Sequence, residues 1–228
     1  VTDKFDNINK GDVFVCIKGN RFDAHTLAVR AIEEKGAAAV VVEHDTGAEN
    51  QVIVDNTRKA YSFLCWEYFG RPTEKLKMIG ITGTNGKTTV SFLIKHIFEE
   101  AGIKCGLLGT VINLVGDEER VSSLTTPDPF EMQMLFREMV DKNCEVCIME
   151  VSSQALSQQR VAPITFDLGI FTNLTQDHLD YHGTMDAYKE AKHLLFENSK
   201  KVILNDDDEA SEYMGSGISA EKVTYSIK

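Results

Sequence analysis

A glycine-rich segment that ends in Gly-Lys-Thr-Thr, residues 83–89, carries the clearest chemical signal in the sequence. It follows an apolar run that predicts a buried strand and precedes residues 90–98, whose spacing predicts an amphipathic helix. In such a strand–turn–helix, backbone N–H groups and the helix dipole favour a bound phosphate. Lys87 adds a positive charge for the phosphates, and the Thr88 hydroxyl can coordinate Mg²⁺. The strict P-loop pattern has glycine where this chain has Ile81, so we predict a shorter variant of that loop.

Metal-capable side chains follow two later apolar runs. Glu150 ends a predicted strand, and a carboxylate at a strand end near a P-loop can hold Mg²⁺. His178 and His182 lie four residues apart in the polar segment 173–183, a spacing that on a helix can bind zinc. Leu179, however, stands where the general base of the zinc-protease motif would be. A magnesium site at Glu150 is therefore favoured over a zinc hydrolase.

Other polar residues give weaker signals. Lys192 lies in a predicted helix, and its spacing alone places it on the solvent-facing side. Residues 125–127 and 152–160 are predicted loops rich in hydroxyl and amide groups. Arg160 in the second loop could bind a phosphate or carboxylate through two hydrogen bonds.

The composition of the 228 residues limits the class of protein. With 24 basic and 35 acidic residues the formal charge is −11, which argues against a nucleic-acid partner. No apolar run reaches the roughly 18 residues of a membrane span, and the first residues do not form a signal peptide. Five scattered cysteines predict reduced thiols in the cytoplasm. Cys144 and Cys147 have the spacing of a redox pair, but Cys147 lies in a predicted strand rather than at the helix start that such a pair needs. The first residue is not methionine, so we expect a fragment.

The predicted elements divide at a polar, proline-containing segment, residues 71–75. Before it we expect strands at 13–18, 38–43 and 52–54 and helices at 24–35 and 57–70. After it we expect strands at 77–82, 104–109, 145–150, 166–171, 201–204 and 222–226, a hairpin of 111–115 with 120–123, and helices at 88–101, 129–142, 184–197 and 207–214. Alternating helices and apolar strands predict an α/β fold with a mostly parallel sheet, which binds ligands at the carboxyl ends of its strands. The expected domains are 1–72 and 73–228.

Five segments, in this order, resemble the motifs of the Mur ligases: GTNGKTT at 83–89, TTPDP at 125–129, MEVSSQAL at 149–156, NLTQDHLDYHG at 173–183 and YKEAKHLLF at 188–196. Residues 11–15 and 36–41 are similar to the uridine-binding domain of the family branch that adds the third peptide residue. The resemblance implies a small N-terminal α/β domain that binds the UDP substrate, followed by a P-loop-type ATPase domain.

The resemblance also implies an ATP-dependent amide ligase of peptidoglycan precursor synthesis. In that family ATP phosphorylates the terminal carboxylate of the UDP-MurNAc-L-Ala-D-Glu substrate, and the amine of the incoming amino acid then attacks the acyl phosphate. Mg²⁺ and Lys87 would offset the charge of the transferred phosphoryl group. We expect a monomeric cytoplasmic enzyme without a nucleic-acid or membrane partner. The sequence does not decide between L-lysine and meso-diaminopimelate as the amino acid.

Roles carry over from the matched motifs residue by residue. The ATP-binding residues would be Gly83, Thr84, Asn85, Gly86, Lys87, Thr88, Thr89 and Asn173. Thr88 and Glu150 would hold the first Mg²⁺, and His178 would bind a second metal ion. Lys192 matches a lysine that the family carbamylates with CO₂, which converts a cation into a carboxylate-like metal ligand. The catalytic residues would then be Lys87, His178 and Lys192, and the muramoyl-peptide contacts Thr125, Thr126, Ser152, Gln158 and Arg160.

Two departures from the family pattern bear on function. Lys4-Phe5-Asp6 stands where the family has Asp-Ser-Arg, so Phe5 lacks the hydroxyl that contacts the uridine nucleotide, although its ring can stack on a uracil. We find no counterpart of the family's third domain, which selects the amino acid, and we expect this chain alone to bind nucleotide weakly without turnover.

The alternatives fall into three classes. Another ligase of the superfamily, such as a folylpolyglutamate synthase or cyanophycin synthetase, is disfavoured by TTPDP and the small N-terminal domain. A small P-loop kinase or GTPase would give Lys192 no role. A non-catalytic binder of a nucleotide-linked sugar would be indicated if Lys87→Ala left function intact.

Overall fold

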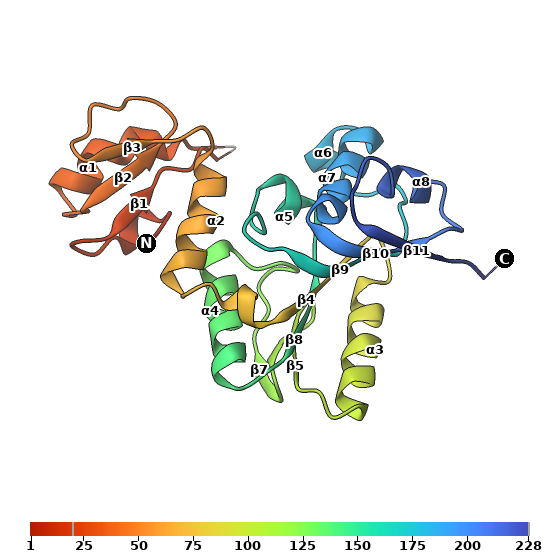
Figure 1. Cartoon of the computed structure of the whole chain (residues 1–228). Helices are drawn as coiled ribbons and strands as arrows, with labels where there is room; N and C mark the ends of the chain where they lie inside the picture. The colour runs from red at the N-terminus through yellow and green to blue at the C-terminus, as the bar shows by residue number, and fades with distance from the viewer. Residues whose placement is uncertain (20, 228) are drawn as a thin grey trace. The chain divides into compact units, whose positions relative to one another are not determined.

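The computed structural model describes residues 1–19 and 21–227, and the chain forms two compact units that divide between Gly70 and Arg71. Figure 1 shows the chain coloured from its N-terminus to its C-terminus. The mixed α/β architecture with mainly parallel strands confirms the predicted fold class.

The smaller unit is built on a parallel sheet in the order β1-β2-β3. Buried Phe14 and Val40, neighbours in the sheet, pack against Ala28 and Ala31 of helix α1. These alanines allow the helix backbone to approach the strands closely. The elements of this unit are β1 (Val13–Val15), β2 (Ala39–Val42), β3 (Gln51–Ile53), η1 (Phe5–Asn7), η2 (Ala24–Leu27), α1 (Ala28–Glu33) and α2 (Thr57–Tyr68).

The larger unit is built on an eight-stranded sheet in the order β11-β10-β9-β4-β8-β5-β6-β7. The strands from β11 to β5 run parallel, whereas β6 and β7 form an antiparallel hairpin at one edge. The strands are β4 (Lys77–Thr82), β5 (Cys105–Leu108), β6 (Asn113–Val115), β7 (Glu118–Arg120), β8 (Val146–Glu150), β9 (Phe166–Phe171), β10 (Ser199–Asn205) and β11 (Glu221–Tyr225).

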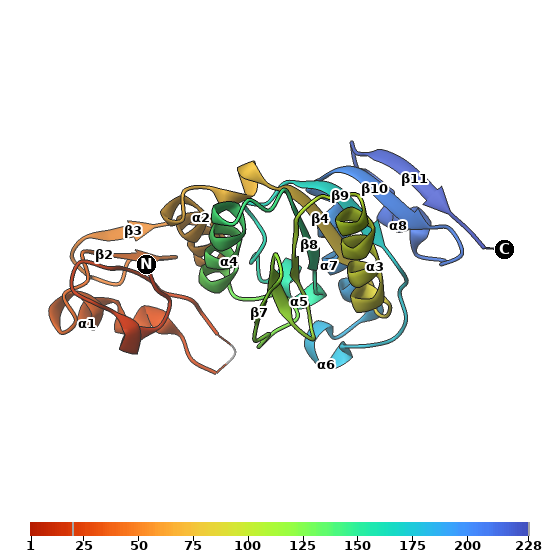
Figure 2. The ribbon, with the colours of Figure 1, turned by 90° about the horizontal axis from the view of Figure 1, so that it is seen from below.

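Helices pack on both faces of this sheet (Figures 1 and 2). Helix α3 covers one face through Val90, Ile94 and Phe98, which pack against a cluster of isoleucines and valines on the strands. Helices α4, α7 and α8 cover the other face with a second apolar cluster. The helices are η3 (Pro72–Lys75), α3 (Lys87–Glu100), α4 (Pro129–Asp141), α5 (Ser153–Ser157), α6 (Leu179–His182), α7 (Met185–Glu197) and α8 (Ser211–Met214).

Three local predictions were wrong. Most of the predicted loop at 152–160 is helix α5, which begins where the Ser152 side chain accepts a hydrogen bond from the Ala155 N–H, an N-cap that the serine pair could have signalled. The predicted loop at 172–183 contains the short helix α6. The second hairpin strand is β7 rather than 120–123, because the chain already reverses at Gly116 and Asp117.

Candidate active site

Three of the predicted motifs meet because β4 lies between β8 and β9 in the sheet. Ile81 of β4 pairs with Glu150 of β8, and Thr82 pairs with Phe171 of β9. Since these strands are parallel, the glycine-rich loop, Glu150 and the segment that begins at Thr172 all leave the same edge of the sheet. This is the edge at which α/β sheets bind ligands.

The glycine-rich loop is held tightly against the segment that follows β9. Gly83 has φ +152°, and a Cβ at this residue would lie 1.9 Å from the Thr172 Oγ1. The Asn173 side chain forms two hydrogen bonds to the backbone of Asn85, accepting from its N–H (2.9 Å) and donating to its carbonyl (3.0 Å). Asn173 therefore braces the loop in this structure. The loop ends at Gly86, which has φ +86° and is the N-cap of α3. The backbone N–H groups of the first turn of α3, which have no partner within the helix, therefore lie at the site.

Two lysines converge on one carbonyl group of this loop. The Lys87 Nζ donates to the carbonyls of Gly83 (2.8 Å) and Thr84 (2.9 Å), and the Lys192 Nζ donates to the same Gly83 carbonyl (2.9 Å). Burial lowers the pKa of Lys87, while the negative charges of Glu150 and Asp177 act in the opposite direction. The Lys87 ammonium group therefore lies at the loop where a phosphate would bind.

Lys192 is almost fully buried, with 1% of its surface exposed, so its predicted place on the solvent-facing side of the helix is wrong. Its Nζ lies 4.4 Å from the centre of the Tyr188 ring, a cation–π geometry. Burial first, and then the positive charge of Lys87, lower the pKa of Lys192 to about 7. An amine with such a pKa is about half neutral at pH 7 and becomes mostly neutral above it, and the neutral form is a nucleophile.

Glu150 forms the centre of a second group of polar side chains. The carboxylate is fully buried and accepts hydrogen bonds from the Thr88 hydroxyl (3.0 Å) and from both the N–H (3.1 Å) and the hydroxyl (3.0 Å) of Thr110. The Thr110 hydroxyl also lies 3.0 Å from the Thr125 Oγ1. Hard oxygen donors of this kind are the ligands that Mg²⁺ prefers.

The predicted substrate residues adjoin this group. The Thr126 hydroxyl donates to the Glu150 carbonyl (2.9 Å) and accepts from the Ser152 N–H (3.0 Å). The Arg160 guanidinium donates to the Thr126 carbonyl (2.8 Å) and twice to the Gln158 Oε1 (3.0 and 2.7 Å). The structure thus links the TTPDP turn, the end of β8 and the residues after α5 into one network with a fixed cation.

His178 stands at the start of α6 with φ +52° and is half exposed. Its ring lies edge-on to the ring of Tyr188, with 6.1 Å between the ring centres. The Lys192 Nζ contacts the same Tyr188 ring. His182 is directed elsewhere, with its Nε2 at 2.9 Å from the Ser153 Oγ. Within residues 1–19 and 21–227, no three His, Cys, Asp or Glu side chains are grouped so as to hold a metal ion.

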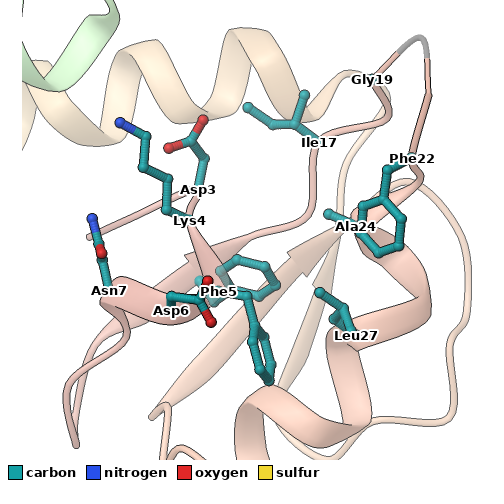
Figure 3. A pocket seen from close by; sticks show the side chains of 11 residues that line it. Asp3, Lys4, Phe5, Asp6, Asn7, Ile17, Gly19, Phe22, Ala24 and Leu27 are labelled. Carbon is teal, nitrogen blue, oxygen red and sulfur yellow. The ribbon is translucent and has the colours of Figure 1, made fainter.

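The smaller unit contains a pocket of about 480 Å³ (Figure 3). In that view Asp6 and Asn7 line one side, while Phe22 and Leu27 line the other. The Phe5 ring packs edge-on against Phe14 (6.1 Å between centres), so it also belongs to the core of this unit. The volume is within the usual range for small-molecule pockets.

Residues 81–228 match the family described as Mur ligase middle domain. The chain belongs to the Mur ligase family. A UDP-N-acetylmuramoyl-L-alanyl-D-glutamate--2,6-diaminopimelate ligase of Clostridium tetani is 46% identical over 97% of this chain, and one of Clostridium perfringens is 48% identical over 90%. The chain covers 47% and 43% of these two Mur ligases, and so spans about half the length of the curated relatives it matches.

Solved Mur ligase structures share the fold. A ligase with the same name superposes with a TM-score of 0.84 at 26% identity, over 98% of this chain and 47% of that chain. The MurF ligase of Thermotoga maritima in complex with ADP gives a TM-score of 0.59 at 18% identity, over 99% of this chain and 49% of that one. A structure described as an FPGS-AMPPCP complex gives a TM-score of 0.59 at 16% identity, over 73% of this chain and 50% of that one.

Sequence reasoning on this Mur ligase missed Thr110 and Tyr188. Thr110 follows β5 at the same sheet edge as Glu150, so the strand-end rule that selected Glu150 could have selected it too. Tyr188 is 1% exposed, and its hydroxyl lies 3.2 Å from the Thr84 Oγ1; a tyrosine on an amphipathic helix gave no separate signal. In the described part of the chain, no helix is both long and apolar enough to cross a membrane.

Proposed function

We propose that this chain forms the ATP-binding and muramoyl-peptide-binding parts of a ligase that adds the third amino acid to UDP-MurNAc-L-Ala-D-Glu. The convergence of Lys87, Thr88, Glu150 and Lys192 at one sheet edge carries this proposal. The names of the curated relatives support 2,6-diaminopimelate, rather than lysine, as that amino acid. Because these relatives match both units, they favour this ligase over a folylpolyglutamate synthase.

ATP would bind with its phosphates over the glycine-rich loop. The N–H groups at the start of α3 would donate to phosphate oxygens, and Lys87 would exchange its two carbonyl partners for the β- and γ-phosphates. The hydroxyl of Thr88 and the carboxylate of Glu150, only 3.0 Å apart, suit a hard cation that would take the place of their hydrogen bond. When bound, Mg²⁺ would offset the charge of the phosphoryl group during transfer.

Lys192 is proposed to react with CO₂ through its neutral amine. The nitrogen lone pair adds to the carbon of CO₂ and the nitrogen loses a proton, which leaves a carbamate with one negative charge. The lowered pKa of about 7 supports this reaction because the neutral amine is available at neutral pH. When carbamylated, Lys192 would supply a carboxylate-like ligand for a metal ion, with His178, on the other side of the Tyr188 contact, as the proposed second ligand.

The acceptor carboxylate of the muramoyl peptide would lie against Arg160, Thr125, Thr126, Ser152 and Gln158. There it would attack the γ-phosphate of ATP, which gives an acyl phosphate and releases ADP. The amine of diaminopimelate would then attack the acyl carbon and displace inorganic phosphate, which forms the amide. The UDP part is proposed to bind the smaller unit, whose pocket offers Phe22 as an apolar wall for the uracil ring.

The five buried free cysteines fit a reducing cytoplasm, which is the proposed location of the protein. We also propose that the protein is a monomer, which sedimentation would test.

The decisive experiment uses the protein at its full natural length with ATP, Mg²⁺, UDP-MurNAc-L-Ala-D-Glu and either diaminopimelate or lysine. We expect amide product and ADP with diaminopimelate. Lys87→Ala should abolish product, whereas Lys189→Ala, a surface lysine of α7, should not. Absence of amide product with every amino acid tried would refute the proposed function.

A further inference from the structure

Three side-chain contacts join helix α6 to helix α5 and to Gln158, the residue after it. The His182 Nε2 lies 2.9 Å from the Ser153 Oγ, and the Tyr181 hydroxyl lies 3.1 Å from the Ser157 Oγ and 3.0 Å from the Gln158 Nε2. Helix α6 starts at His178 in a left-handed conformation that costs a residue other than glycine about 1 kcal/mol or more. These three contacts add to the packing of α6 against α7 and stabilise the position of this short helix.

The direction of each hydrogen bond around Gln158 is fixed by what its neighbours can donate. Arg160 carries only donors, so the side-chain atom that receives its two hydrogen bonds must be the Gln158 oxygen. The Gln158 amide nitrogen must therefore point at Tyr181 and donate to its hydroxyl oxygen. A flipped amide would place N–H groups against the guanidinium.

Gln158, Tyr181 and Ser157 form a relay of hydrogen bonds, in which either hydroxyl of the Tyr181–Ser157 pair can donate by geometry and the second partner of Ser157 favours one direction. The Ser157 hydroxyl donates to the Gln154 carbonyl (3.2 Å), so its oxygen is free to accept from the Tyr181 hydroxyl. The order of donation is Gln158 to Tyr181, Tyr181 to Ser157, and Ser157 to the backbone of α5. Each hydroxyl in the relay both accepts and donates, so Tyr181 locks the orientation of the Gln158 amide.

We propose that Tyr181 is a positioning residue for substrate binding: through Gln158 its hydroxyl holds the Arg160 guanidinium in the orientation that receives the acceptor carboxylate. The inference rests on the proposed function for the identity of that carboxylate. Arg160 is held on its other side by the Thr126 carbonyl, so with Gln158 fixed the guanidinium has one orientation. Without the tyrosine hydroxyl, the Gln158 amide can rotate and release two of the hydrogen bonds described for Arg160.

The relay also ties substrate binding to His178, which lies three residues before Tyr181. A substrate carboxylate that fixes Arg160 would fix Gln158, Tyr181 and α6 in turn. The proposed metal ligand at the start of that helix would then be held more firmly when the muramoyl peptide is bound.

The test compares Tyr181→Phe with Tyr213→Phe, which removes a hydroxyl from α8 of the same unit. In the full-length protein, Tyr181→Phe should raise the KM for the muramoyl dipeptide about 3- to 10-fold, the usual effect of one lost hydrogen bond, and leave the KM for ATP unchanged. Tyr213→Phe should change neither value. A KM for the muramoyl dipeptide that stays at the wild-type value would overturn the inference, as would an equal rise in both KM values.

A double-mutant cycle separates the relay from general damage to α6. Ser157→Ala removes the group that accepts the Tyr181 proton, so Ser157→Ala combined with Tyr181→Phe should be little worse than Tyr181→Phe alone. Multiplicative effects of the two substitutions would show that the hydroxyl groups act independently and would refute the relay.

An activity-independent measurement distinguishes failure of the inference from failure of the proposed function. In NMR spectra, the Arg160 Nε–H should exchange with water at least several-fold faster in Tyr181→Phe than in the wild type, and should be unchanged in Tyr213→Phe. If the wild type makes no amide, the proposed function fails, while this exchange still decides whether Tyr181 positions Arg160. Equal exchange in Tyr181→Phe and the wild type would overturn the positioning role.

Discussion

Replacing Lys192 by methionine should stabilise the folded chain, and the gain should depend on pH. Lys192 has a pKa of about 7 in the folded chain against about 10.5 when unfolded, so the unfolded state binds the proton more tightly. For a base with a lowered folded pKa, folding is penalised at low pH, and the penalty diminishes as the pH rises from 7 towards 10.5. Each pH unit in that window changes the free energy of unfolding by about 1.4 kcal/mol.

The magnitude follows from the pKa difference and one hydrogen bond. Near pH 7 the penalty is about 4 kcal/mol, from which about 1 kcal/mol is subtracted for the lost bond to the Gly83 carbonyl. Lys192→Met should therefore be more stable than the wild type by about 3 kcal/mol at pH 7 and by about 1 kcal/mol at pH 9. Methionine fills a similar volume, so little cavity cost is expected.

The assay is urea unfolding of both proteins at pH 7 and pH 9 in CO₂-free buffer, because a carbamate on Lys192 would remove the charge. Lys189→Met on the same helix, whose side chain is 28% exposed, is the matched control and should change stability by less than about 0.5 kcal/mol at both pH values. A stability difference between Lys192→Met and the wild type that is the same at both pH values would refute the assignment of a lowered pKa to this lysine.

Three further predictions follow from the geometry of the larger unit. Gly83→Ala should weaken ATP binding at least about tenfold in calorimetric titration, because its Cβ would lie 1.9 Å from the Thr172 Oγ1 and displace the loop; unchanged affinity would contradict this packing. Glu150→Gln should make ADP affinity insensitive to added Mg²⁺, and a retained Mg²⁺ effect would show that the ion is held elsewhere. Gly106→Ala should lower the free energy of unfolding by about 1–3 kcal/mol, because its Cβ would lie 2.3 Å from the Met139 Sδ, and wild-type urea stability would contradict that contact.

Much of the fold could be predicted because its signals are local. Strand β4 and strand β9 have the predicted limits, since an apolar run that ends in polar loop residues defines both ends. Helix α5 was not predicted because five residues are too few to show the hydrophobic periodicity of a helix. The serine that caps it is also common in loops. Strand β7 begins earlier than predicted because strand pairing, rather than residue preference, decides where the second strand of a hairpin starts.

In the candidate site, too, local sequence signals identified the residues, whereas the pairing of the strands decided their arrangement. The residues of the glycine-rich loop and Glu150 were predicted from their place after apolar strands, and the sheet order then brought them together. The roles assigned to individual residues of the site stay predictions, since the structure shows their contacts and not their ligands.

The sequence by itself determined that a phosphate-binding loop opens helix α3 and that polar motifs follow successive strands, because the turn and the strand ends are encoded by neighbouring residues. Only the tertiary structure decided that Lys192 is buried, since its burial depends on β4 and the Gly83 carbonyl, which are distant in sequence. Burial beside Lys87 lowers the pKa of Lys192 and so gives this lysine a chemistry that its helical spacing could not indicate.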